Sequence, residues 1–204
     1  MDMIKRYSRI TFTVLVGLGI LAGLYIASRY SYLLFHSLAE LFSIVVAYSI
    51  FILAWNTRSF TDNGYLLFLG IAFLFIGSLD IVHTLSYKGM GVIQGEDSNL
   101  PTQLWIGARY FEALSLLIAP LFIRRKVPVR WVVAAYALVE ALLLLSIFWW
   151  HIFPACYIEG TGLTPFKKVS EYIIASIMAV SVSLLWLNKS EFDRGVLNLL
   201  SGGV

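Results

Sequence analysis

Three pairs of polar side chains in this sequence have the types and the spacing to act together. They are His36 and Glu40, Asp80 and His83, and Arg109 and Glu112. The residues of the first pair are four positions apart, and those of the second and third pairs are three positions apart. In a helix, each pair therefore lies on one face. Imidazole and carboxylate groups bind zinc, manganese, iron or copper, whereas arginine binds carboxylates and other anions.

These pairs are compatible with four kinds of site. A metal site would use His36, Glu40 and His83, and the two histidines would also suit the axial positions of a haem. Arg109 argues against a pure metal site, because a fixed cation repels a metal ion. It fits an arginine–carboxylate pair better, or a clamp on an anionic ligand. In the fourth alternative the polar groups only fix the register of neighbouring helices.

The pairs lie within long apolar segments. The chain has 204 residues, of which 59% are hydrophobic and 13% charged, with a mean hydropathy of +0.82. Six runs are each long enough to cross about 30 Å of hydrocarbon as a helix. They cover residues 10–28, 33–55, 65–86, 102–123, 131–150 and 169–187. We therefore expect an all-α fold, a polytopic membrane bundle of six transmembrane helices forming one domain over residues 1–200.

The positions of lysine and arginine predict the orientation of this bundle. The N-terminus, the turns at 56–64 and 124–130 and the C-terminal tail together hold ten of the fifteen basic residues, and the opposite side holds four. We expect both termini in the cytoplasm. The net charge of +3 reflects this asymmetry, so we expect contact with the lipid bilayer and no nucleic-acid partner.

With this topology, the three pairs fall at similar depths. At 1.5 Å per residue, they lie about 5 to 16 Å below the outer surface of the membrane. The cytoplasmic half of the bundle has almost no such groups. Because ionisable residues inside a membrane generally face the bundle interior and find partners there, we expect one polar pocket in the outer half.

The remaining motifs limit the function further. Cys156 is the only cysteine, so an intrachain disulfide is impossible. The stretch YKGMG at 87–91 is read as a helix stop, with a flexible lid as the alternative. The sequence has no Gly-rich phosphate loop, nucleophile elbow or HExxH motif, so we expect no enzyme activity from this chain.

Three stretches resemble the MASE3 family of bacterial membrane-associated sensor domains. They are FHSLAELFSIVVAYSIFILAW (35–55), LGIAFLFIGSLDIVHTLSYKGMGV (69–92) and NLPTQLWIGARYFEALSLLIAPLF (99–122). The resemblance implies an N-terminal input module, which in this family is joined to PAS domains, histidine kinases, diguanylate cyclases or phosphodiesterases. Carried over position by position, the polar signature of the family falls on His36, Glu40, Asp80, His83, Tyr87, Lys88, Arg109 and Glu112.

We therefore expect a sensory module of the bacterial inner membrane. It would bind a small ligand or ion in the polar pocket and act on a fused or associated cytoplasmic effector, as a homodimer. A haem- or metal-binding redox or transport protein and a purely structural bundle are the alternatives. Because MASE3 domains usually continue with further membrane segments, the tail at 201–204 is compatible with a chain cut before them.

Overall fold

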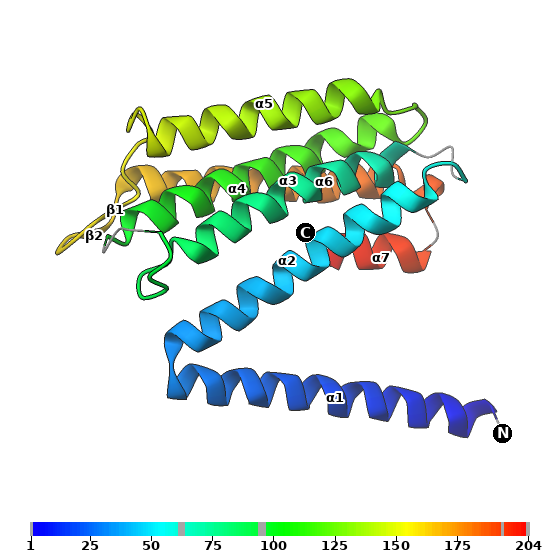
Figure 1. The fold of residues 1–204 in the computed structure, drawn as a ribbon. Helices are drawn as coiled ribbons and strands as arrows, with labels where there is room; N and C mark the ends of the chain where they lie inside the picture. The colour runs from blue at the N-terminus through cyan, green and yellow to red at the C-terminus, as the bar shows by residue number, and fades with distance from the viewer. Residues whose placement is uncertain (1, 61–63, 94–96, 193, 203–204) are drawn as a thin grey trace. The chain divides into compact units, whose positions relative to one another are not determined.

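The computed structural model describes residues 2–60, 64–93, 97–192 and 194–202, and most of them are helical (Figure 1). The helices are α1 (Asp2–Tyr30), α2 (Tyr32–Thr57), α3 (Gly64–Leu85), α4 (Asn99–Ile118), α5 (Val129–Phe148), α6 (Pro165–Leu187) and α7 (Arg194–Gly202). The first six contain segments long and apolar enough to cross a membrane, which confirms the predicted fold class. The predicted tail at 201–204 falls partly outside the described residues.

The chain divides into two compact units, Met1–Phe42 and Ser43–Val204, with the boundary inside α2. The first unit contains α1 and the beginning of α2. Only Ser31 separates these two helices. Its Oγ accepts a hydrogen bond from the backbone N–H of Leu34 at 3.3 Å, so Ser31 caps the start of α2.

In the second unit, α3 is the central helix. The four consecutive residues Leu69, Gly70, Ile71 and Ala72 are all buried, and successive residues of a helix point about 100° apart, so α3 is buried on every side. A helix that is apolar around its whole circumference is stable when other helices surround it. α3 contacts both α4 and α5, and α4 also contacts α6 (Figure 1).

Small residues bring α3 close to the later part of α2. A Cβ atom added to Gly77 would lie 3.3 Å from the Cβ of Ala47, and one added to Gly70 would collide with Ala54. Such small residues are common where helices pack in membranes, because they let two backbones approach. Tyr48 Oη and Ser78 Oγ, 3.2 Å apart, add a hydrogen bond to this contact.

Two helix ends differ from the sequence-based ranges for clear local reasons. α4 gives way to a 3₁₀ turn, η1 (Ala119–Phe122), because Pro120 has no N–H for the helical ladder. α3 ends at Leu85, and Gly89 (φ 98°) and Gly91 (φ 68°) adopt left-handed conformations in the segment that follows. The interpretation of residues 87–91 as a stop therefore agrees with the structure, but the glycines form the turn and do not cap the helix.

The end of the second unit at which α3 finishes and α4 begins is called the α3–α4 end below. It carries an antiparallel hairpin that the sequence did not predict, formed by β1 (Tyr157–Ile158) and β2 (Gly162–Leu163). Its strands join α5 to α6, so the hairpin lies at the same end as the segment between α3 and α4 (Figure 1).

The opposite end, called the α4–α5 end, has an apolar core. Its buried members are Tyr65, Phe68, Leu69, Leu116, Ala119, Ile123, Leu185 and Leu197. Leu197 belongs to α7, which the sequence also did not predict and which follows a short 3₁₀ turn, η2 (Lys189–Glu191). Arg124 forms an ion pair with Glu191, which lowers the pKa of the glutamate and raises that of the arginine.

Candidate functional site at the α3–α4 end

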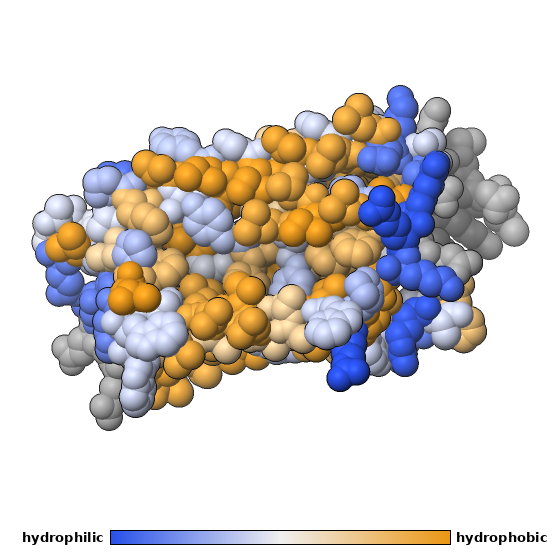
Figure 2. Space-filling model, turned by 90° about the horizontal axis from the view of Figure 1, so that it is seen from above, coloured by the Kyte–Doolittle hydropathy of each residue, from blue (hydrophilic) through white to orange (hydrophobic). Residues whose placement is uncertain are grey.

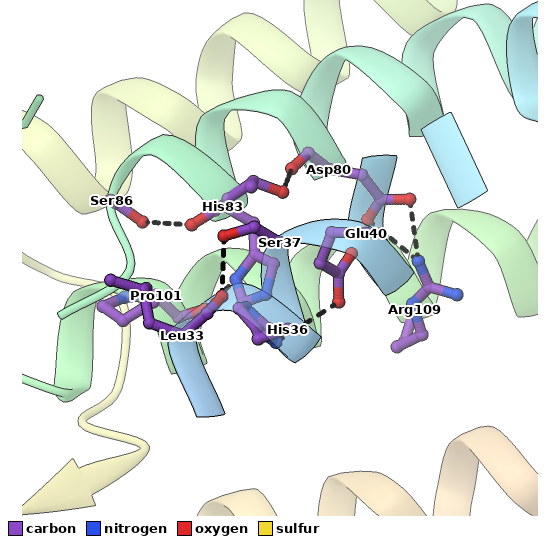
Figure 3. Close-up of polar contacts among 10 residues, drawn as sticks. Leu33, His36, Ser37, Glu40, Asp80, His83, Ser86, Pro101 and Arg109 are labelled. Atoms are coloured by element: carbon purple, nitrogen blue, oxygen red, sulfur yellow. Dashed lines mark hydrogen bonds and ion pairs between the residues drawn. The ribbon is translucent and has the colours of Figure 1, made fainter. Parts of the chain in front are cut away.

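A group of largely buried ion pairs inside the second unit centres on Arg109. Its Nη2 donates to both oxygens of Asp80, at 2.9 and 3.0 Å (Figure 3). Its Nη1 donates to Oε2 of Glu112 at 2.5 Å. The side chain of Asp80 is only 3% exposed, while those of Arg109 and Glu112 are 23% and 16% exposed. Arg109 therefore links α3 to α4 through ion pairs whose three side chains are largely buried.

His83 is one turn further along α3 and is 4% exposed. Its Nδ1 lies 2.8 Å from the backbone oxygen of Pro101 in the first turn of α4. Because a carbonyl oxygen only accepts, Nδ1 carries the proton, and in the neutral ring Nε2 is then the acceptor. Metal-binding histidines are held in this way, with one ring nitrogen donating to a carbonyl and the other facing the metal.

Local hydrogen bonds hold these side chains in position. Thr84 Oγ1 donates to the backbone oxygen of Asp80 at 2.7 Å. Ser86 Oγ donates to the backbone oxygen of His83 at 2.8 Å (Figure 3). At the start of α4, Asp97 Oδ1 accepts from the N–H of Asn99 at 2.8 Å. The last turn of α3 and the first turn of α4 are thus both fixed by side chains that satisfy their terminal backbone groups.

Tyr87 and Lys88 occupy the border of the site. The ring of Tyr87 meets that of His83 edge to face, with centroids 6.4 Å apart. Lys88 Nζ is 3.1 Å from Oε1 of Glu159 in the β1–β2 turn, and both side chains are more than half exposed. Lys88 therefore connects the segment after α3 to the hairpin.

The predicted pair of His36 and Glu40 belongs to the first unit. On α2, Nδ1 of His36 and Oε1 of Glu40 are 4.0 Å apart, and the ring of Tyr32 stacks on that of His36 with centroids 6.3 Å apart. The helical spacing thus brings these two side chains together, as expected. The predicted metal site would join this pair to His83 of the second unit, and it stays a prediction.

Sequence reasoning missed the residues that attach the loop between α5 and α6 to α4. Asn99 Oδ1 accepts from the N–H groups of Cys156 and Tyr157, at 2.7 and 3.0 Å. Gln103 Nε2 donates to the backbone oxygens of Phe153 and Pro154, at 3.0 and 3.1 Å. The available signal was the spacing of Asn99 and Gln103, two amides four residues apart at the start of an apolar helix.

Lys167 and Cys156 complete this end of the unit. Lys167 is 8% exposed, forms an ion pair with Glu171, and places its Nζ 4.8 Å from the centre of the Trp105 ring. Cys156 has no exposed surface, and burial raises the pKa of its thiol to about 11. The thiol therefore keeps its proton at neutral pH, which makes Cys156 a packing residue and a poor nucleophile.

The charges around Arg109 determine which ligands suit the site. Two carboxylates face one guanidinium group, so the group carries one net negative charge when all three are ionised. Arg109 already binds both carboxylates, which leaves it poorly placed to clamp an anion. Carboxylate oxygens together with an accepting imidazole nitrogen favour a cation or a hydrogen-bond donor.

Comparison with known proteins identifies the family. The sequence model of MASE3, a membrane-associated sensor domain, matches residues 27–204 and so includes every residue of the predicted polar signature. Comparisons with curated proteins and with solved structures gave no match. Since the match covers most of the chain, including α2 to α7, the chain belongs to the MASE3 family of membrane-associated sensor domains.

Proposed function

We propose that this chain is the sensory input module of a membrane signalling protein and that the Arg109 network with His83 is the centre of its ligand site. The observation that carries the proposal is the pairing of Arg109 with Asp80, because this contact joins α3 and α4 through charges. A ligand that competes for either carboxylate changes how the two helices are held together. Ionisable groups inside a membrane are usually functional for this reason.

The ligand that suits this chemistry best is a small cation, with a divalent metal ion as the first candidate. His83 has the hydrogen bond to a backbone carbonyl that metal-binding histidines typically make. Asp80 and Glu112 offer carboxylate oxygens. His36 and Glu40 are proposed, from their depth in the sequence-derived topology, to contribute further ligand atoms.

The signal would leave through the other end of the same helices. Binding would shift α3 against α4, and small helix shifts of this kind act as switches because packed interfaces hold discrete arrangements. We place the α3–α4 end outside the cytoplasm, since most lysines and arginines lie toward the α4–α5 end. The α4–α5 end would then face a cytoplasmic effector, either fused or associated, with the chain acting as a homodimer in the bacterial inner membrane.

Metal analysis of purified protein in lipid nanodiscs tests this proposal. Elemental analysis and a titration with Mn²⁺ or Zn²⁺ should give a defined stoichiometry. His36→Ala and His83→Ala should each weaken binding, whereas Arg109→Ala should strengthen it, because it removes the cation that competes for Asp80 and Glu112. Lys168→Ala is the matched control, because Lys168 is an exposed lysine near the start of α6 and lies outside the predicted polar signature, and this variant should bind as the unmodified protein does.

An absorption spectrum of the same sample tests the haem alternative, since a Soret band would replace the cation site with a haem site. Absence of binding, or binding that none of the three substitutions changes, would overturn the cation proposal.

A further inference from the structure

Glu140 is an acidic residue near the middle of α5 that the proposed ligand site does not use. It lies eleven positions after the first residue of α5, Val129, and so roughly 16 Å along the span at 1.5 Å per residue. Within the described part of the chain, no hydrogen bond or ion pair joins its carboxyl group to another residue. The described residues of the same chain therefore give this carboxyl group no hydrogen-bond partner and no counter-ion.

The surroundings of Glu140 are apolar. On α5, Leu138, Val139 and Leu142 are 61%, 51% and 45% exposed, and α5 is one of the six candidate membrane spans. Seen from the side of α5, hydrophobic side chains cover the middle of the unit, and hydrophilic ones gather at the end where α5 begins (Figure 2). An isolated charge in hydrocarbon is very costly, so a carboxyl group in such a place is more stable in its neutral form. The neutral group is stabilised further by a hydrogen bond.

A hollow lies between α3, α4 and α5, and Tyr136 in its lining is four residues before Glu140 on α5. Its volume is about 300 Å³, and its lining includes Leu114 and Ile118 of α4 with Val132, Ala135 and Val139 of α5. The polar atoms in its wall are the hydroxyl groups of Ser115 and Tyr136, which are hydrogen-bonded to each other at 2.5 Å. The lining of the hollow is therefore suited to apolar side chains, because its two hydroxyl groups are already hydrogen-bonded to each other.

We propose that this face of α5 and the adjoining hollow form the interface with a second copy of the chain, in which the two Glu140 carboxyl groups meet. A two-fold axis along the membrane normal keeps equivalent residues at equal depth. The Glu140 carboxyl groups of the two copies then lie at the same depth in the membrane. Each protonated carboxyl has one donor and one acceptor, so two of them form two mutual hydrogen bonds.

The geometry of α5 favours this occupant over a lipid tail. Tyr136 lines the hollow and lies four residues before Glu140, and residues four apart are neighbours on a helix surface, so the carboxyl group and the hollow adjoin each other. A lipid tail would fill the hollow and leave the carboxyl in hydrocarbon without a partner. A second copy satisfies both. This interface rests on the proposed function only in giving the homodimer a location, since its evidence is separate from the ligand site.

Disulfide cross-linking of the full chain in membranes tests the interface. Cys156→Ser removes the only native cysteine. A cysteine is then introduced by Val139→Cys at the proposed interface or by Val180→Cys on α6, which is the control because Val180 is equally exposed, at 50%. Oxidation should give covalent dimers through position 139 in large excess over position 180. Equal yields at the two positions, or no dimer at position 139, would overturn the interface.

Fluorescence energy transfer between labelled copies in liposomes tests the role of Glu140. Glu140→Leu should raise the dissociation constant of the dimer at least about tenfold, since it removes both mutual hydrogen bonds and a tenfold change corresponds to about 1.4 kcal/mol. Glu140→Gln should stay close to the unmodified protein, because an amide both donates and accepts. Unchanged association of Glu140→Leu would rule out the carboxyl contact. Neither assay involves a metal, so the proposed interface can be disproved without affecting the proposed ligand site, and the ligand site can be disproved without affecting the interface.

Discussion

The two ends of α3 are held against α4 by different forces. At the α3–α4 end, Asp80 meets Arg109 and His83 meets the carbonyl of Pro101, so directional contacts hold the two helices together. At the α4–α5 end, Phe68 and Leu69 pack into an apolar core with Leu116. Charges and hydrogen bonds change when a ligand or a proton arrives, whereas a packed apolar core does not. Under the proposed function, the α3–α4 end is the one that a ligand changes. We call it the responsive end and the α4–α5 end the passive end.

Removing Arg109 is the change with the largest expected effect on stability. Arg109→Ala would leave the buried carboxyl of Asp80 without its cation, and breaking such a pair from one side costs about 3–5 kcal/mol. The free energy of unfolding, measured in mixed micelles by adding a denaturing detergent, should fall by that amount.

Arg109→Lys is the matched control for this substitution. It keeps the charge but cannot bind both oxygens of Asp80 in a planar fork, so it should fall between the alanine variant and the unmodified protein. A loss below about 1 kcal/mol for Arg109→Ala, the range of an exposed pair, would mean that the responsive end is not held by this ion pair.

At the other end, Leu69→Ala should cost less, about 2–3 kcal/mol. Leu69 is 4% exposed and packs in the core, so its truncation leaves a cavity. In a bilayer the lost contacts count but the transfer from water does not, which puts the cost at the low end of the usual range. The same unfolding assay checks the value, and metal binding should be unchanged. A loss of binding by this variant would show that the two ends are not separate.

His83→Phe should cost about 1–2 kcal/mol, since it removes one hydrogen bond to a buried carbonyl while keeping a ring of similar size. Metal affinity should fall far more than stability. The free energy of unfolding and the metal affinity are compared for this variant, because a residue that only packs would change the free energy of unfolding and leave the metal affinity unchanged. Unaltered metal affinity would remove His83 from the proposed ligand set.

The smallest effect is expected at the edge of the responsive end. Lys88→Ala breaks the pair with Glu159, whose side chain is 62% exposed, and exposed pairs contribute about 0–1 kcal/mol. Raising the salt concentration should weaken the unmodified pair further. If Lys88→Ala changes the unfolding free energy as much as Leu69→Ala, the hairpin is part of the responsive end and not only a cover beside it.

Much of this arrangement could be predicted from the sequence because it depends on local patterns. Six apolar runs predict six helices, and the spacing of Arg109 and Glu112 predicts their contact on one helix face. The sequence also predicts that Arg109 pairs with a carboxylate, but its contact with Asp80 on another helix depends on how α3 packs on α4. The partner of His83 could not be predicted, since a backbone carbonyl of another helix leaves no trace in residue type.

The hairpin and the short last helix were missed for related reasons. Strands of two residues, β1 and β2, have no periodicity to detect, and they depend on Asn99 holding the backbone of Cys156 and Tyr157. In α7, only Leu197 is buried among the side chains described for that helix. Its position follows from contacts with the apolar core, which no local pattern encodes.

A double-mutant cycle between Asp80 and Arg109 tests the central claim most directly. The unfolding free energies of Asp80→Asn, Arg109→Gln and the double variant would be measured beside a parallel cycle on Lys88 and Glu159. Charged contacts that are enclosed by protein should give a coupling energy of about 1.5–3 kcal/mol, and the exposed pair about 0.2–1 kcal/mol. A coupling energy between Asp80 and Arg109 no larger than that of the exposed pair would contradict the proposal that charges hold the responsive end together.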